Sequence, residues 1–111
     1  MKQMTPEAAA ETAALIAELW QRHLPTLLER LDLLDRIAAS SVAGPLSKED
    51  RDEGIAISHK FAGSLGMYGY RRGTEVATAM EQLFRSDEPL QPEDLIALTC
   101  ALREAVFPVQ P

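Results

Sequence analysis

The sequence predicts an all-α fold, an antiparallel, up-down-up-down four-helix bundle with an additional N-terminal helix. Apolar residues recur every three or four positions along almost the whole chain, which is the helical period. Many of the seven prolines and six glycines mark the ends of these stretches, and no segment alternates as a strand would. With 111 residues, of which 46% are hydrophobic and 25% charged, residues 1–111 are expected to form a single domain.

The N-terminal helix is expected over about 6–23. Thr5 is a suitable N-cap, and Pro6 suits the first helical position because its missing N–H would be unpaired there anyway. Pro25 cannot donate a backbone hydrogen bond and crowds the preceding turn. The sequence therefore predicts a break or kink just before it, which separates the N-terminal helix from a bundle over about 25–107.

The four bundle helices are bounded by similar signals. Gly44 closes the first of them, and Ser47 caps the next, expected over about 48–68, with Gly69 as a left-handed C-terminal cap. The last helix opens at Pro92. Apolar stripes mark the first, third and fourth bundle helices at Leu27, Leu28, Leu31, Leu34 and Ile37, at Val76, Ala77, Met80, Leu83 and Phe84, and at Leu95, Leu98, Leu102 and Val106.

Charge and composition exclude several classes of function. The net charge is −6, whereas binding to a phosphate backbone requires a basic stripe that displaces counterions, so nucleic acid is not an expected partner. No uninterrupted apolar run approaches the roughly 20 residues needed to cross a bilayer, and no membrane association is expected. Cys100 is the single cysteine and cannot form an internal disulfide. A cytoplasmic protein is therefore expected.

The helix over 48–68 points a histidine away from its apolar face. At about 100° per residue, Ile57, Phe61 and Leu65 lie about 160°, 200° and 240° from His59 around the helix axis. These three side chains form the expected core stripe. His59 should therefore face outward.

Small residues surround this outward histidine, where a solvated helix face would carry long polar side chains. Each interior glycine costs a helix about 1 kcal/mol relative to alanine, so the pair Gly63 and Gly66 requires an explanation. Either this face packs closely against another helix, or a partner or a bulky modification must approach the imidazole. The residues around His59 on the outward side are Asp52, Ile55, Ala56, Ala62, Gly63 and Gly66.

The segment Ser58–Gly69, SHKFAGSLGMYG, resembles the signature of histidine-containing phosphotransfer (HPt) domains. That resemblance implies a four-helix bundle whose exposed histidine exchanges a phosphoryl group with the aspartate of a response-regulator receiver domain, or takes it from a hybrid histidine kinase. His59 matches the phosphoacceptor, and Gly63 matches the glycine that leaves room for the phosphoryl group. Lys60 matches a basic neighbour that stabilises it. Ala62 departs from the pattern, since many members have lysine there.

The resemblance implies a phosphocarrier and not an enzyme. The chain has neither a nucleotide-cradling glycine loop nor histidines at metal-ligand spacing. No cofactor is therefore expected, and Mg²⁺ should come from the partner receiver. That partner should dock on Asp52, Ile55, Ala56, Ala62 and Gly66.

Two further questions stay open in the sequence. One alternative function is an HPt-like module that is not phosphorylated and that regulates a receiver or kinase by binding alone, because Ala62 removes the common lysine. A monomer is expected. An apolar face on the N-terminal helix, which includes Leu15 and Leu19, would also suit a dimer.

Overall fold

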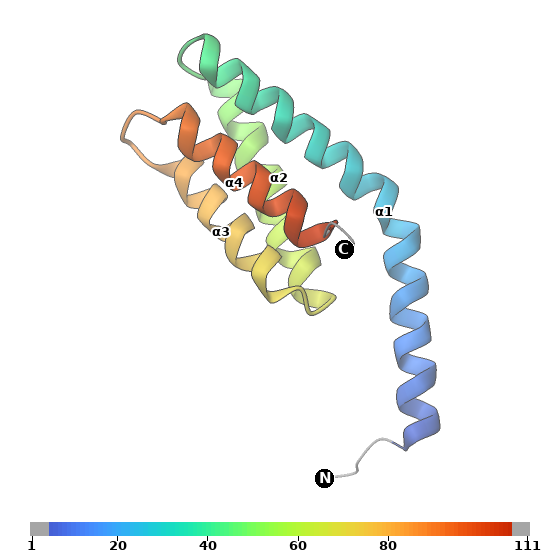
Figure 1. Ribbon diagram of the computed structural model, residues 1–111. Coiled ribbons are helices and arrows are strands. Elements are labelled where there is room, and N and C mark those ends of the chain that lie inside the picture. Colours follow the sequence, from blue (N-terminus) through green and yellow to red (C-terminus); the bar gives the residue numbers. More distant parts are fainter. Residues whose placement is uncertain (1–4, 108–111) are drawn as a thin grey trace.

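The computed structural model describes residues 5–107, and this part of the chain is almost entirely helical. Its helices are α1 (Pro6–Ala43), α2 (Lys48–Met67), α3 (Arg71–Arg85) and α4 (Pro92–Val106). Helices that follow one another along the chain run in opposite directions, and short loops join them (Figure 1). The predicted all-α helical bundle is confirmed.

Helix α1 is longer than the sequence predicted. The two helices expected over about 6–23 and from residue 25 onward form one continuous helix of 38 residues, with Pro25 inside it. The prediction of a separate N-terminal helix was therefore wrong. Proline removes one hydrogen bond, but the turns on either side keep theirs, so the chain bends without leaving the helical conformation. Figure 1 shows the axis of α1 changing direction where its colour passes from blue to cyan.

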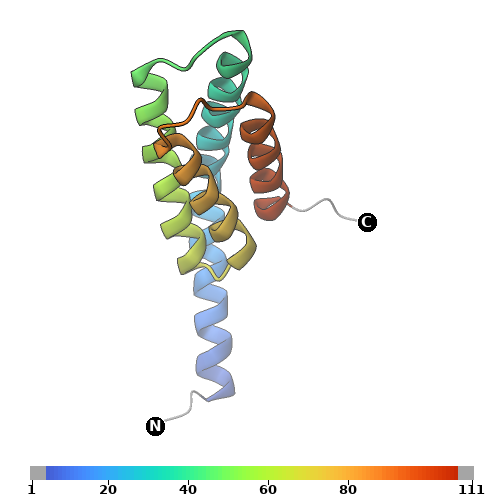
Figure 2. The same cartoon turned by 90° about the vertical axis from the view of Figure 1, so that its left-hand side faces the viewer.

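The two parts of α1 differ in burial. All the buried residues of α1 lie between Leu27 and Ser41, within the part that packs in the bundle. The part before Pro25 extends beyond the other helices as an arm (Figure 2). Trp20 anchors this arm, because its ring stacks on Tyr70 with centroids 4.6 Å apart and meets the edge of Tyr68 at 5.1 Å. These two tyrosines lie in the α2–α3 connection.

The core lies between the four helices. Helix α2 packs most extensively on α3, which packs on α4, and α1 contacts both α4 and α2. Most of the apolar stripes predicted from the sequence point inward. The fully buried large side chains are Leu27, Leu31, Leu34, Ile37, Phe61, Leu65, Met80, Phe84, Leu95 and Leu102.

The predicted caps explain where the helices begin and end. Thr5 and Ser47 accept hydrogen bonds from the N–H groups of Ala8 and Asp50 at 3.1 and 3.0 Å. Each cap satisfies one of the donors that a helix N-terminus leaves unpaired. Gly69 has φ of +80°, the left-handed conformation predicted for the residue that ends α2. These residues thus mark where α1 and α2 begin and where α2 ends.

Two glycines allow α2 and α3 to approach closely. A Cβ atom on Gly54 of α2 would lie 2.5 Å from the ring of Phe84 on α3, and one on Gly73 of α3 would lie 2.7 Å from Cδ1 of Leu65 on α2. Both distances are shorter than any carbon contact allows. The absence of a side chain at these two positions therefore sets the spacing between the two helices that surround the candidate site.

Candidate functional site

His59 lies on the outer face of α2, as the sequence predicted. Its side chain is 73% exposed, whereas Ile57, Phe61 and Leu65 on the opposite face are buried. Ser58, the residue before His59, is also buried and donates a hydrogen bond to the Gly54 carbonyl oxygen at 2.7 Å. The imidazole is thus presented to solvent by a helix whose other side is firmly packed.

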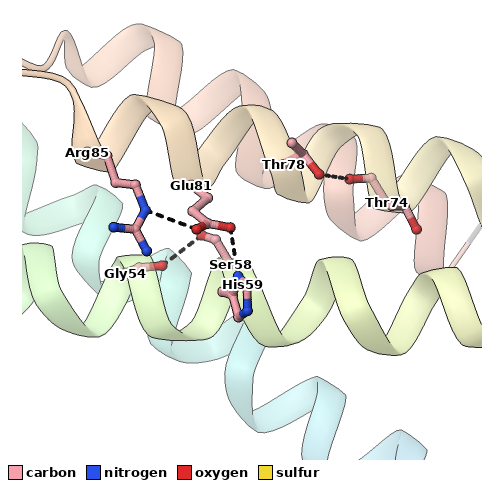
Figure 3. A network of polar contacts seen from close by, with 7 residues as sticks. All are labelled: Gly54, Ser58, His59, Thr74, Thr78, Glu81 and Arg85. Carbon is pink, nitrogen blue, oxygen red and sulfur yellow. Dashed lines mark hydrogen bonds and ion pairs between the residues drawn. The ribbon is translucent and has the colours of Figure 1, made fainter.

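Helix α3 supplies two charged residues to this histidine. Nδ1 of His59 lies 3.1 Å from Oε1 of Glu81, and Nε of Arg85 donates to Oε2 of the same carboxylate at 2.9 Å (Figure 3). The Glu81 side chain is only 17% exposed. The Arg85 hydrogen bond, with a smaller contribution from the His59 hydrogen bond, lowers the pKa of Glu81 below its ordinary value. Glu81 is therefore ionised at neutral pH.

This contact determines which nitrogen of the ring is free to react. An ionised carboxylate only accepts hydrogen bonds, so a neutral imidazole facing it must carry its proton on Nδ1. The lone pair of the neutral ring then resides on Nε2, the nitrogen away from Glu81. The arrangement gives His59 a nucleophilic nitrogen on its solvent side.

The small residues on this face leave open space. A Cβ atom on Gly63, one turn after His59, would have no neighbouring atom within 4 Å, and one on Gly66 would meet only the Thr74 hydroxyl oxygen at 3.6 Å. Close helix packing therefore does not account for Gly63. Of the two explanations that the sequence left open, access to the imidazole is the one that fits this position.

The other predicted site residues do not form one continuous exposed surface. Asp52 and Ala56 are exposed, and Asp52 accepts a hydrogen bond from Lys48 at 2.7 Å. Ile55 and Ala62 are half-buried and pack against the core, because α3 covers their side of α2. Lys60 is exposed, and no ion pair joins it to another residue of the described chain.

Sequence reasoning missed several residues near the histidine. Glu81 and Arg85 lie 22 and 26 residues beyond His59, and nothing in the periodicity of α3 indicates which neighbour they face. An exposed apolar side chain also lies farther along α2. Met67, eight residues after His59 on the same side of α2, is 75% exposed. It lines a shallow groove with Leu19, Arg22, His23, Ser64 and Tyr68.

The part of the chain that the structure describes contains neither a cluster of metal-ligating side chains nor a membrane-spanning helix. No group of three or more histidine, cysteine, aspartate or glutamate residues there could hold a metal ion. None of the helices within residues 5–107 is long and apolar enough to span a membrane.

Comparison with known proteins identifies the family. The family profile of the Hpt domain matches residues 15–106, which include all of α2, α3 and α4 and most of α1. The chain belongs to the Hpt domain family. Hpt domains are phosphocarrier modules of two-component signalling, and they are not enzymes. The matched segment contains His59, so the histidine singled out by its exposure lies within the Hpt domain.

One curated relative supports this identification. Protein RcaC of Microchaete diplosiphon is 28% identical to the Hpt domain described here over 80 residues, which are 72% of this chain. The aligned part is 12% of the relative, so the chain spans a small fraction of that protein's length. No solved structure matches the chain significantly.

Proposed function

We propose that this protein is a cytoplasmic histidine phosphotransfer protein of a phosphorelay. In this proposal His59 accepts a phosphoryl group from the aspartate of a response-regulator receiver domain, or from a hybrid histidine kinase, and passes it on. The observation that carries the proposal is the exposed His59 imidazole, with Glu81 at Nδ1 and open space above Gly63. Membership of the Hpt family supports it.

The chemistry follows from the ring orientation. The Nε2 lone pair attacks the phosphorus of an aspartyl phosphate, an N–P bond forms, and the P–O bond to the aspartate breaks, which returns that residue to its carboxylate. Positive charge develops on the ring during attack, and the Glu81 carboxylate lies 3.1 Å from Nδ1, where it stabilises that charge. The reverse reaction passes the phosphoryl group to the next receiver. Mg²⁺ bound by the receiver would neutralise charge on the phosphoryl oxygens.

Lys60 is the residue of this chain proposed to stabilise the phosphoryl group. A phosphoryl group carries a charge of about −1.5 to −2 near neutral pH, and Lys60 is the adjacent residue, exposed and without an ion pair within residues 5–107. Ala62 offers no charge at the position where many family members have lysine. We therefore assign the cationic role to Lys60 alone on α2.

The receiver is proposed to dock around the histidine. The exposed members of the predicted docking set, Asp52, Ala56 and Gly66, follow the outer side of α2. The groove beside Met67 and Leu19 continues this surface onto α1 with apolar contacts. Ile55 and Ala62 would contribute only the edges of their side chains, since both are half-buried. A small interface of this kind suits a transient encounter, and the protein is proposed to act as a monomer.

The test is transfer from a receiver domain charged with a small phosphodonor. Intact mass should show one added phosphoryl group on the wild-type protein and none on His59→Gln at unchanged helicity. His23→Gln is the matched control, because His23 is the second histidine of the chain and lies on α1 away from the Glu81 contact. This control should still gain one phosphoryl group, because His23 lines the groove proposed for docking and does not accept the group.

The alternative function makes the opposite prediction. If the protein is a binding module without phosphorylation, no receiver of the host will transfer a phosphoryl group to it. Receiver binding would then persist unchanged in His59→Ala. That combination of results would reject the phosphorelay role and favour regulation by binding alone.

A further inference from the structure

The Glu81 carboxylate connects His59 to a second residue. Each of its oxygens has one partner, since Oε1 contacts Nδ1 of His59 at 3.1 Å and Oε2 accepts from Nε of Arg85 at 2.9 Å. Glu81 is 17% exposed, whereas the side chains of His59 and Arg85 are 73% and 58% exposed. The carboxylate is therefore the sheltered centre of a three-residue chain that ends at Arg85 (Figure 3).

Arg85 restrains the carboxylate in two ways. A glutamate side chain has three rotatable bonds, so a single contact at Oε1 would leave the carboxylate group free to rotate. The Arg85 contact at Oε2 restricts that rotation. The guanidinium also favours the ionised form of the carboxylate. The ionised form can only accept a hydrogen bond from Nδ1, whereas a protonated carboxyl group could donate one to it. Both effects act on His59 through Glu81.

No other arginine at this end of α3 could take this role. Arg51 of α2 also lies at this end of α3, but it donates to the carbonyl oxygens of Phe84 at 2.7 Å and Ser86 at 3.2 Å. Arg71 pairs with Glu75 near the opposite end of α3. Within residues 5–107, Arg85 is the cation that contacts Glu81.

We propose that Arg85 is a positioning residue for phosphoryl transfer, which holds Glu81 so that Nδ1 of His59 keeps its proton and Nε2 is the nucleophile. This inference rests on the proposed function for its kinetic consequence. Its structural consequence, the tautomer of the His59 ring, can be measured without any phosphoryl transfer. The two can therefore fail separately.

The first test is a double-mutant cycle on the transfer rate from a charged receiver. Arg85→Ala should slow transfer roughly two- to fivefold, the range expected from an exposed ion pair, and Glu81→Ala about tenfold. The double variant should equal Glu81→Ala, because Arg85 acts through that residue. A further slowing by Arg85→Ala in the Glu81→Ala background would overturn the proposal.

A matched control uses the same helix. Arg71→Ala removes another exposed arginine–glutamate contact four residues apart, with Nε 3.6 Å from Oε1 of Glu75. This variant should transfer at the wild-type rate. An equal slowing by Arg71→Ala would show that any loss of positive charge on α3 impairs transfer, and it would reject a specific role for Arg85.

The second test is the ¹⁵N NMR spectrum of the His59 ring in the unphosphorylated protein. The wild type should show mainly the Nδ1–H tautomer, Arg85→Ala a mixture with more Nε2–H, and Arg85→Lys an intermediate distribution, since lysine keeps the charge but not the Nε contact. An unchanged tautomer ratio in Arg85→Ala would overturn the inference. Absence of transfer to the wild type would reject the proposed function, and the ring tautomer would still test Arg85.

Discussion

Gly54 and Gly63 lie nine residues apart on α2 and have opposite surroundings. A Cβ atom on Gly54 would lie 2.5 Å from the buried ring of Phe84, whereas one on Gly63 would meet nothing within 4 Å. Gly54 allows α3 to pack against α2, and Gly63 keeps the surface beside His59 clear. The same residue type thus serves packing in the first half of the helix and access in its second half.

Gly73 and Gly66 show the same contrast at the other end of the pair. A Cβ atom on Gly73 would lie 2.7 Å from Cδ1 of Leu65, the flexible end of a side chain, and one on Gly66 would lie 3.6 Å from the Thr74 hydroxyl oxygen. The first contact requires Leu65 to move, and the second is ordinary van der Waals contact. Packing between α2 and α3 is therefore tightest at Gly54, intermediate at Gly73 and open at Gly63.

The largest effect on stability is expected from Gly54→Val. The added side chain must displace the Phe84 ring from a fully buried site, and overpacking of this kind costs about 1–3 kcal/mol. Urea unfolding should show a lower midpoint with a loss of about 2 kcal/mol. The double variant Gly54→Val with Phe84→Leu should recover part of that loss, because leucine frees space at the contact. A Gly54→Val protein as stable as the wild type would contradict the packing role.

The next largest effect is expected on transfer from Gly63→Leu. Leucine has a higher helix propensity than glycine by about 0.8 kcal/mol, and the space around Gly63 is open, so stability should stay the same or rise. A bulky side chain one turn from His59 should obstruct the receiver and slow transfer on the order of tenfold, about 1.4 kcal/mol.

The control for that variant is Gly63→Ala. Its single methyl group should raise stability with a smaller effect on the transfer rate. If Gly63→Leu transferred at the wild-type rate, the open surface at Gly63 would not be needed for the receiver to reach His59. If Gly63→Leu greatly lowered stability, Gly63 would serve packing instead.

A smaller change in stability is expected from Gly73→Ala. Replacing the glycine gains up to about 1 kcal/mol of helix propensity, while Leu65 must shift its Cδ1 atom to make room. The two effects nearly cancel, so the free energy of unfolding should change by less than about 1 kcal/mol. If urea unfolding showed that Gly73→Ala lowers the free energy of unfolding as much as Gly54→Val does, packing would not be tighter at Gly54 than at Gly73.

The smallest effect distinguishes the charged contact of Glu81 from the apolar contact of Gly54 by its pH dependence. Arg85 and His59 lower the pKa of Glu81 below its ordinary value of 4.5, so the folded state binds its proton less readily than the unfolded state. The stabilisation is complete above the ordinary value and is lost as pH falls through the lowered one. The difference in unfolding free energy between the wild type and Glu81→Gln should therefore shrink as the pH falls below the ordinary pKa of Glu81.

Gly54→Val provides the control for this titration. It alters an apolar contact with Phe84, so its stability difference from the wild type should stay constant over the same acidic range. Unfolding curves recorded at several pH values would test both expectations. A difference for Glu81→Gln that grew with acidification would contradict the direction of the Glu81 pKa shift.

The sequence predicted those features of the fold and site that depend on neighbouring residues. The caps at Thr5 and Ser47, the left-handed Gly69 and the outward direction of His59 all follow from residues within a few positions, and the structure confirms them. The prediction of a separate N-terminal helix failed at Pro25, because the local cost of a proline does not show whether the turns beside it will persist.

Helical periodicity by itself determined that this protein is a helical bundle and that His59 points away from its core, since a helix places every side chain by its own repeat. Only the tertiary structure decided what His59 meets there. Glu81 and Arg85 come from α3, and Nδ1 contacts a carboxylate 22 residues away because Gly54 and Gly73 let the two helices approach. The same packing decided which glycine contacts a neighbouring helix and which faces open space, because that depends on the distance between helices.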